Sequence, residues 1–364
     1  MRMLQMLACA LPLLIAATGT APADPALVTA AEREGRVVVY SVLSNKAAAP
    51  LIEDFRELYP RIAVDYDGEK GSNDMDARFR AERAAGQPTA DIVWSSSTDM
   101  QMKLVAEGYA ATYRSPQAGG LPRWAIFRDQ AYGTTLEPVV LAYNKELLPP
   151  EKVPQDHVSL IRALGTDSTF RGRVTGFDIT KSGVGLMFLL QDRSRLGSLD
   201  RLLAAFSKAD FAPSAGTGDM LVGINSGRFV LGYDIMGAYA ISRSAKDLPK
   251  LGVVFPRDYT LLLTRVAFVS RKAAHPNAAR LWLDYLLSPR GQKILGDAIE
   301  LYPIRQDVEA RFTASKLLAQ LGPAAWPIRP DLSLVHALES PERRAVLRGW
   351  AAAMSRPAVA KQGR

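Results

Sequence analysis

Hydrophobic and polar positions in the first third of the chain form strand-like and helix-like patterns in turn. Residues 36–41 contain a short, continuous apolar run, which is typical of a strand buried on both faces. An amphipathic helix follows, and its apolar stripe consists of Leu51, Ile52, Phe55 and Leu58. Further strands are expected at residues 61–66 and 90–94, and further helices at residues 76–85 and from residue 98 onward. This strand–helix order predicts a parallel sheet covered by helices.

The pattern changes beyond the first third. Residues 135–144 and 259–270 are long, mostly apolar segments, and a second series of strands and helices begins at residue 173. This order predicts an α/β protein of two lobes, in which the chain crosses twice between the lobes. The predicted lobes are residues 24–140 with 262–310, and residues 141–261 with 311–364.

The first 23 residues have the features of a secretory signal peptide. Arg2 supplies a positive charge, an uncharged and mostly apolar stretch follows, and residues 21–23 (Ala-Pro-Ala) offer the small side chains of a cleavage site. A membrane anchor is the alternative, but the apolar run is shorter than the roughly 20 residues of a spanning helix. We therefore expect cleavage before Asp24 and a periplasmic product.

Composition narrows the range of functions. The 364 residues include 45 Lys and Arg against 37 Asp and Glu, and the hydrophobic fraction of 48% excludes a mainly disordered chain. The formal charge of +8 is spread without any run of five basic residues, so nucleic-acid binding is not expected. The single cysteine, Cys9, lies in the predicted signal peptide. The mature chain therefore has neither a disulfide nor a thiolate site.

Five loops follow predicted strands on the edge where an open α/β sheet binds ligands. They are residues 41–46, 67–72, 95–98, 180–183 and 214–218, and they are rich in Gly, Lys and small polar residues. Thr180, Lys181, Ser182 and Gly183 follow a strand and open a helix, an arrangement suited to holding an anion. The residues alone leave a second interpretation equally open, in which Ser182 or Thr180 only caps the helix.

Residue types and motifs that are typical of catalytic sites are scarce in these loops. His157, His275 and His336 are the histidines of the chain, and none follows a predicted buried strand; His157 and His275 stand beside prolines, as in surface turns. The chain contains no G-x-S-x-G elbow and no H-E-x-x-H helix. We therefore expect a binding protein and not an enzyme.

Several short strings occur in an order and spacing found in one family. They are VVVYS (37–41), PTADIVWS (88–95), VLAYN (140–144), TKSG (180–183), NSG (225–227), AARLW (278–282) and LLSPRGQ (286–292). On these strings the chain resembles the periplasmic solute-binding proteins of ABC transporters, in the branch with ferric-ion, sugar-phosphate and phosphonate receptors. The resemblance implies the type 2 fold: two lobes, each a central sheet flanked by helices, with the ligand cleft between them and closure by hinge motion.

The ferric members of this family bind iron through a histidine, an acidic residue and two adjacent tyrosines. At those positions this chain has Ser44, Ser96 and the pair Met236-Gly237, none of which suits Fe³⁺. Tyr233 and Asp234 lie close by, so a ferric receptor with an altered ligand set is kept as an alternative. No metal and no cofactor is expected.

The anion-binding part of the family pattern is better preserved. Ser182, Gly183 and Val184 stand where ferric members have a Ser-Gly-Ala turn that holds an anion, and Lys181 adds a charge. Thr217 falls near a further anion-contacting position. The resemblance therefore implies a monomeric receptor for a small anionic organic solute, preferably a phosphate ester or a phosphonate, which is delivered to an ABC permease of the inner membrane. A sensor that acts on a membrane histidine kinase is the alternative of another class.

The complete set of expected ligand-binding residues also includes serines of the first lobe and two acceptors of the second lobe. The serines are expected to form neutral hydrogen bonds, and Tyr233 and Asp234 to accept from hydroxyls of the ligand. The set is Ser41, Ser44, Ser95, Ser96, Thr180, Lys181, Ser182, Gly183, Val184, Thr217, Tyr233 and Asp234.

Overall fold

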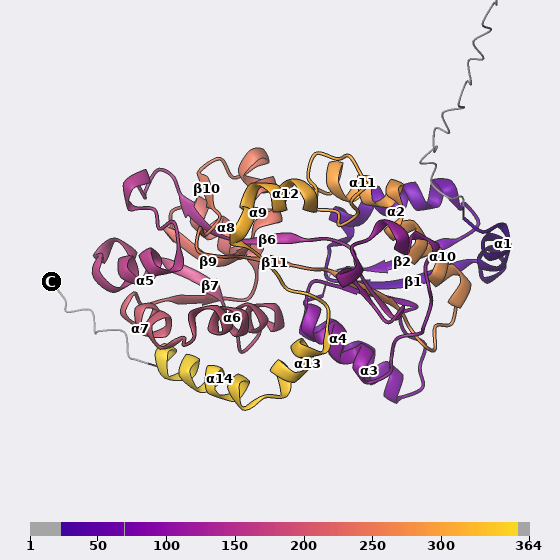
Figure 1. Cartoon of the computed structure of the whole chain (residues 1–364), viewed down its shortest axis with the longest axis horizontal. Helices are drawn as coiled ribbons and strands as arrows, with labels where there is room; N and C mark the ends of the chain where they lie inside the picture. Colours follow the sequence, from indigo (N-terminus) through magenta and orange to yellow (C-terminus); the bar gives the residue numbers. More distant parts are fainter. Residues whose placement is uncertain (1–22, 69, 356–364) are drawn as a thin grey trace, which may run out of the picture.

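The computed structural model describes residues 23–68 and 70–355. Residues 1–22 of the predicted signal peptide lie outside this part of the chain. The described residues form two sheets that lie end to end along the long axis of the molecule, each flanked by helices (Figure 1). The two-lobed α/β architecture implied by the resemblance is confirmed. We call the part built around the first sheet the first lobe, and the part built around the second sheet the second lobe.

The first sheet has six strands in the order β2-β1-β3-β12-β5-β4. Strands β1, β2 and β3 are parallel, as the alternation of strand and helix patterns predicts, and β12, β5 and β4 extend the sheet in antiparallel fashion. The strands are β1 (Arg36–Ser41), β2 (Ala63–Asp67), β3 (Ile92–Ser95), β4 (Ile126–Phe127), β5 (Ala131–Gly133) and β12 (Val266–Val269). The helices of this lobe are α1 (Pro25–Glu34), α2 (Asn45–Leu58), α3 (Ser72–Ala84), α4 (Thr98–Ala106), α10 (Pro276–Leu287) and α11 (Pro289–Asp297).

The second sheet has seven strands, in the order β13-β11-β6-β9-β7-β8 with β10 paired to β6. The strands are β6 (Glu137–Asn144), β7 (Val174–Phe177), β8 (Ala212–Ser214), β9 (Leu231–Met236), β10 (Leu251–Val254), β11 (Thr260–Leu263) and β13 (Ala325–Pro327). The helices around it are α5 (His157–Thr166), α6 (Gly183–Leu196), α7 (Asp200–Lys208), α8 (Thr217–Asn225), α9 (Gly237–Lys246) and α12 (Ala314–Leu321).

The chain passes between the sheets at two places. It leaves the first sheet after Gly133 and enters the second at Glu137, and it returns between Leu263 and Val266. The long apolar segment expected at residues 259–270 is therefore two strands, β11 and β12, that belong to different sheets. The division of the lobes at residues 140/141 and 261/262 stays a prediction.

The C-terminal helices connect the two lobes a third time. Helix α13 (Leu332–Glu339) packs against α4 of the first lobe, and α14 (Pro341–Met354) packs against α7 of the second lobe. Ser340 alone separates the two helices. In Figure 1 they run along one edge of the molecule, with α13 beside α4 and α14 below α6 and α7.

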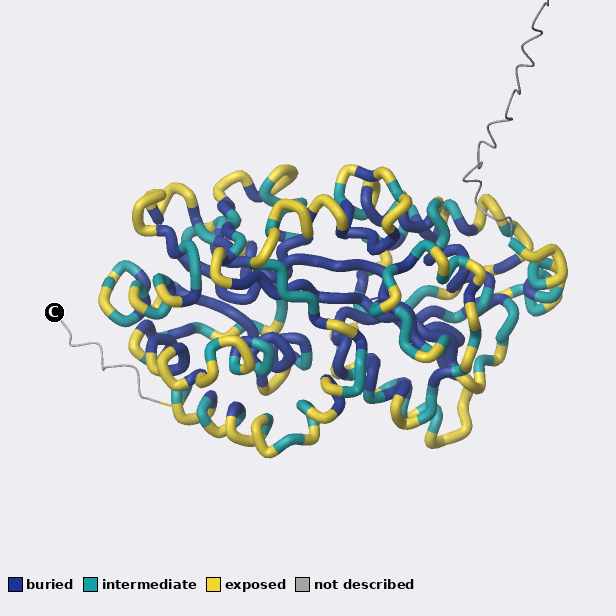
Figure 2. Tube along the Cα trace, in the orientation of Figure 1, coloured by how far each residue is buried: buried dark blue, intermediate teal, exposed yellow. Residues whose placement is uncertain are grey.

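Apolar side chains hold each lobe together. Figure 2 shows buried segments along both sheets and exposed segments on the outward faces of the helices. In α2, the predicted stripe buries Leu51, Ile52 and Phe55, and Phe55 meets the Trp282 ring of α10 edge-on at 4.8 Å. Leu58, the last residue of the helix, is exposed. Within residues 23–68 and 70–355, helices of the length and apolarity needed to span a membrane are absent.

Candidate ligand-binding site

A cavity of about 450 Å³ lies between the two lobes. This volume is in the range of small-molecule sites, roughly 300–1,000 Å³. All five loops that the sequence places at the carboxyl ends of strands contribute to the wall. The polar residues that line the cavity are Ser44, Lys70, Ser72, Asn73, Asp74, Ser96, Lys181, Ser182, Thr217, Tyr239 and Arg243.

The amino ends of five helices border this cavity. Their N-cap residues are Ser44 of α2, Gly71 of α3, Ser182 of α6, Gly216 of α8 and Met236 of α9, and all five line the cavity. A helix begins with N–H groups that have no partner inside the helix, and the helix dipole adds partial positive charge there. The cavity therefore has a positive field from several directions, which favours an anion.

Only two of these helix ends are closed by a side chain in the part of the chain that the structure describes. The Ser44 hydroxyl accepts from the Ala47 N–H at 3.3 Å, and the Ser182 hydroxyl accepts from the Gly185 N–H at 3.2 Å. The capping interpretation of Ser182 is thus correct, and its hydroxyl proton is still able to donate to a ligand. Helices α3, α8 and α9 lack a side-chain cap among the described residues. Their first N–H groups are therefore open toward a ligand.

Charged side chains on the wall are mostly cationic. Lys70, Lys181 and Arg243 stand against Asp74. Arg243 pairs with Asp247 at 2.6 Å, and Lys181 is an exposed side chain whose ammonium lies 3.6 Å from Asp178. Asp247 and Asp178 offset part of this positive charge, and the helix ends add to it.

The hydroxyl group of Thr217 is buried and has no hydrogen-bond partner among the described residues. The Thr217 side chain is 8% exposed. A buried hydroxyl without a partner costs free energy, so such groups are nearly always bonded in folded proteins. Because Thr217 opens the uncapped helix α8 on the cavity wall, a bound ligand is the natural partner.

The two lobes meet at one edge of the cavity. Asn73 of α3 donates from Nδ2 to the Lys181 carbonyl oxygen at 2.8 Å. Beside this bond, a Cβ atom at Gly183 would lie 2.8 Å from the sulfur of Met100 and 2.9 Å from Oδ1 of Asn73. Glycine at this position therefore lets the two lobes approach each other without displacing the ends of the Met100 and Asn73 side chains.

Three of the expected hydroxyl residues lie elsewhere. Ser41 and Ser95 are buried, and their hydroxyls accept from backbone N–H groups two residues ahead, of Leu43 and of Ser97, at 3.1 Å. The last residue of each strand is thus still inside the lobe, and its hydroxyl stabilises the turn that follows. Thr180 donates to Asp178 at 2.6 Å and faces a neighbouring cavity.

Tyr233 and Asp234 also lie away from the cavity, contrary to the expectation that they accept from ligand hydroxyls. The Tyr233 hydroxyl donates to Asp192 at 2.5 Å, and a side-chain hydrogen bond links Asp234 with Asp192. The pairing of β6 with β9 shifts register here, and Asp234 has a positive φ of 53°. This bulge turns Asp234 away from the face on which Met236 reaches the cavity.

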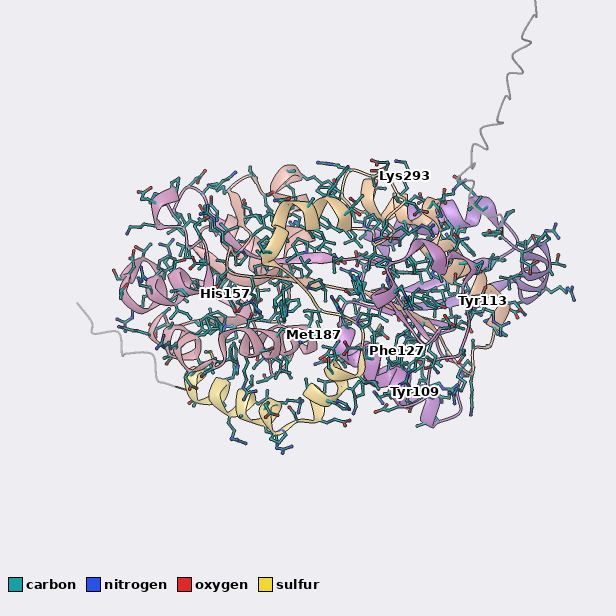
Figure 3. All side chains as sticks on the ribbon, in the orientation of Figure 1. Tyr109, Tyr113, Phe127, His157, Met187 and Lys293 are labelled. Atoms are coloured by element: carbon teal, nitrogen blue, oxygen red, sulfur yellow. The ribbon has the colours of Figure 1, made fainter. Side chains whose placement is uncertain are left out.

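Histidines take structural roles. His157, labelled in Figure 3, is 3% exposed, so the expectation of a surface turn is wrong. Its ring stacks on Tyr259 with centroids 4.0 Å apart, and Nδ1 lies 2.9 Å from Asp258. His275 pairs with Asp91 at 2.8 Å.

Other parts of the wall were missed by sequence reasoning. The helix expected at residues 76–85 begins four residues earlier, at Ser72 of the expected loop 67–72, so Asn73 and Asp74 also reach the cavity. Tyr239 and Arg243, one turn apart on α9, were also missed. Gly71-Ser72-Asn73-Asp74 is the kind of capping signal that precedes a helix, and it could have located the first group.

Comparison with known proteins places this architecture. Residues 87–321 match the family model of the bacterial extracellular solute-binding proteins. The substrate-binding protein of an ABC transporter from Agrobacterium tumefaciens is 32% identical, with a TM-score of 0.82 over 88% of this chain and 94% of that one. No curated protein sequence gave a match.

More distant solved structures share the fold. AfuA from Actinobacillus pleuropneumoniae, solved with fructose 6-phosphate, is 18% identical and has a TM-score of 0.70 over 88% of this chain and 98% of that one. Iron-bound HitA from Pseudomonas aeruginosa is 19% identical and has a TM-score of 0.68 over 85% of this chain and 99% of that one. The chain therefore belongs to the bacterial extracellular solute-binding proteins, a family of non-enzymatic receptors.

Proposed function

We propose that this protein captures a small anionic organic solute, a phosphate ester or a phosphonate, in the cavity between its lobes and delivers it to an ABC permease. The observation that carries the proposal is the convergence of five helix amino ends on one cavity, three of them without a side-chain cap among the described residues. A tetrahedral oxyanion accepts hydrogen bonds in several directions at once, which matches donors arriving from both lobes.

The rest of the wall suits the organic part of such a solute. Phe177, Val184, Leu221 and Met236 supply apolar surface, and the Tyr239 ring stands among them. Inorganic phosphate alone leaves this surface without a partner. An ester or a phosphonate uses both kinds of wall, the donors for its anionic group and the apolar side chains for its carbon frame.

The ferric alternative receives little support from the geometry. The positions that hold iron ligands in ferric receptors correspond to Ser44, Ser96 and Met236, and all three do line the cavity. None supplies the anionic oxygen that Fe³⁺ requires. The nearby Tyr239 hydroxyl already accepts from Arg265 at 3.0 Å. Groups of three or more His, Cys, Asp or Glu placed to hold a metal are absent among the described residues.

A ligand screen tests the proposal directly. The purified mature protein is heated with sugar phosphates, phosphonates, phosphate, dicarboxylates, polyamines and ferric citrate. A solute that binds only the folded state raises the free energy of unfolding by about 2.7 kcal/mol at 100 times its Kd. We expect the melting temperature to rise with a phosphate ester or a phosphonate. A response to ferric citrate or polyamines alone contradicts the proposal.

Thr217→Val is expected to weaken binding of the solute found in the screen by about tenfold, the worth of one hydrogen bond. Valine keeps the shape of threonine and removes a buried hydroxyl that has no partner among the described residues, so stability without ligand should not fall. Titration calorimetry measures the affinity. Thr112→Val, at an exposed position, is the control. Equal affinity in both variants removes Thr217 from the site.

Gly183→Ala is expected to weaken the same binding by up to about tenfold, because the added methyl group displaces the ends of the Met100 and Asn73 side chains of the opposite lobe. Alanine suits the first turn of a helix, so the ligand-free protein should remain as stable as before. Gly165→Ala, where a Cβ meets nothing within 4 Å, is the matched control. Unchanged affinity in Gly183→Ala shows that this contact is not needed for closure on the ligand.

A further inference from the structure

A second cavity, of about 380 Å³, lies on the far side of the contact between Asn73 and Lys181. Its wall comes from α3 and α4 of the first lobe, from α6 and the residues before it in the second lobe, and from both C-terminal helices. Asn73 borders both cavities. The second cavity is thus the place where all three parts of the fold meet.

Asp99 is the most unusual group on this wall. Its side chain is 2% exposed, and its Oδ1 accepts the Met100 N–H at 2.8 Å. Its Oδ2 has no hydrogen-bond partner within residues 23–68 and 70–355. Burial raises the pKa of Asp99 to about 7. A buried carboxyl oxygen in this state is costly unless something that enters the cavity donates to it.

Two further polar atoms on the same wall lack partners among the described residues. One is Oδ1 of Asp76, whose other oxygen accepts from Arg80 at 2.8 Å. The other is Nε of Arg343, in the first turn of α14. The remaining cation of the wall, Lys103, is bound to Glu339 at 2.5 Å. The unmet requirements of the cavity are therefore two donors for carboxylates and one acceptor for a guanidinium group.

We propose that the second cavity binds a small aliphatic zwitterion, whose primary ammonium is held by Asp99 and Asp76 and whose carboxylate is held by Arg343. An ammonium group has three N–H donors, enough for both free carboxylate oxygens, and a carboxylate is the strongest partner of a guanidinium group. Ile179, Leu186 and Leu338 provide apolar surface for an aliphatic side chain.

Other guests fit this wall less well. A phosphate or a phosphonate offers mainly acceptors, so it leaves the free oxygens of Asp76 and Asp99 without donors. A metal ion lacks a set of three acidic or histidine ligands in the described part of the chain. The second site does not depend on the proposed function. The wall includes residues of both lobes and of α13 and α14. A ligand bound here therefore contacts the C-terminal helices and both lobes at the same time.

The test uses L-leucine as the probe and the whole mature protein, titrated by calorimetry at about pH 8.5, where Asp99 is ionised. We expect saturable binding of leucine, and no binding of N-acetyl-leucine, which lacks the ammonium, or of leucinamide, which lacks the carboxylate. The absence of binding with leucine, or equal binding of the three compounds, overturns the proposal.

The variant Asp99→Asn tests whether leucine binds in the second cavity. Asparagine keeps an oxygen for the Met100 N–H and removes the buried charge, so the melting temperature should stay unchanged or rise, while the affinity for leucine falls at least about tenfold. Asp200→Asn, in the first turn of α7 and exposed, is the matched control and should bind leucine as the parent does. Equal affinity in both variants overturns the proposal. So does loss of leucine binding in Thr217→Val, since that result assigns leucine to the first cavity.

Discussion

Glu137→Ala is expected to lower the free energy of unfolding by about 3–5 kcal/mol, because it leaves the Arg265 cation buried without its partner. Both side chains are 1% exposed. The Arg265 guanidinium donates from Nε and a terminal nitrogen to the two carboxylate oxygens of Glu137, at 2.6 and 3.1 Å.

The position of this pair connects its stability to the site. Glu137 is the first residue of β6, at the first crossing between the lobes, and Arg265 lies between β11 and β12, at the second. Arg265 also donates to the hydroxyl of Tyr239 at 3.0 Å, and Tyr239 lines the ligand cavity. The pair therefore holds the two crossing segments together and fixes a wall of the site.

Urea denaturation of Glu137→Ala measures the effect, with the exposed Glu151→Ala as its control. A second variant separates charge burial from packing. The double change of Glu137 and Arg265 to methionine removes both charges and keeps apolar volume, so it should recover most of the lost stability. A loss below about 1 kcal/mol in Glu137→Ala contradicts the interpretation, since that is the range of an exposed ion pair.

The strands and the order of the fold could be predicted because buried parallel strands leave continuous apolar runs. The residues at 36–41 and 90–94 are of this kind, and both became central strands of the first sheet. The wall of the cavity was predictable where a helix begins directly after a strand, as at Ser182. Thr217 was predicted to contact the ligand only from the resemblance to the solute-binding family.

The remaining wall depends on facts that one sequence does not contain. Asn73 and Asp74 were missed because the first turn of α3 has no apolar periodicity. Tyr233 and Asp234 are predicted to meet the ligand because they lie close in the sequence to Met236 and Gly237, where the resemblance places the tyrosine pair of the ferric receptors. The sequence does not show the bulge in β9 that separates them from the cavity. The bond between Asn73 and Lys181 joins residues 108 positions apart. Such contacts follow from how two lobes approach each other, and no local pattern encodes that geometry.

A buried pair of carboxyl groups in the second lobe should make stability fall as the pH rises. Asp192 and Asp234 are both buried and are linked by a side-chain hydrogen bond, and burial raises the pKa of each, that of Asp234 well above its ordinary value. The folded protein therefore keeps a proton that the unfolded chain releases above about pH 4. Since the folded state binds more protons, its stability decreases by about 1.4 kcal/mol for each pH unit until Asp234 ionises.

Asp234→Asn is expected to abolish this slope, so the variant should match the parent near pH 5 and become the more stable of the two as the pH rises, by a margin that grows until Asp234 of the parent ionises. The asparagine amide donates to Asp192 in place of the carboxyl proton, and asparagine tolerates the positive φ of 53° at this position. Urea denaturation at several pH values measures the difference.

Asp192→Asn supplies the contrast, because the two carboxyl groups have different surroundings. Asp192 accepts from the hydroxyls of Tyr233 and Tyr259 at 2.5 and 2.9 Å, so its neutral replacement should lower stability by about 1.5–3 kcal/mol at every pH. Asp234 remains buried in that variant, and its slope should persist. If Asp234→Asn shows the same dependence on pH as the parent, the proton is not held by this pair. If the stability of neither variant falls with rising pH, the two carboxyl groups share the proton equally. In that case the folded protein needs both carboxyl groups to hold the proton.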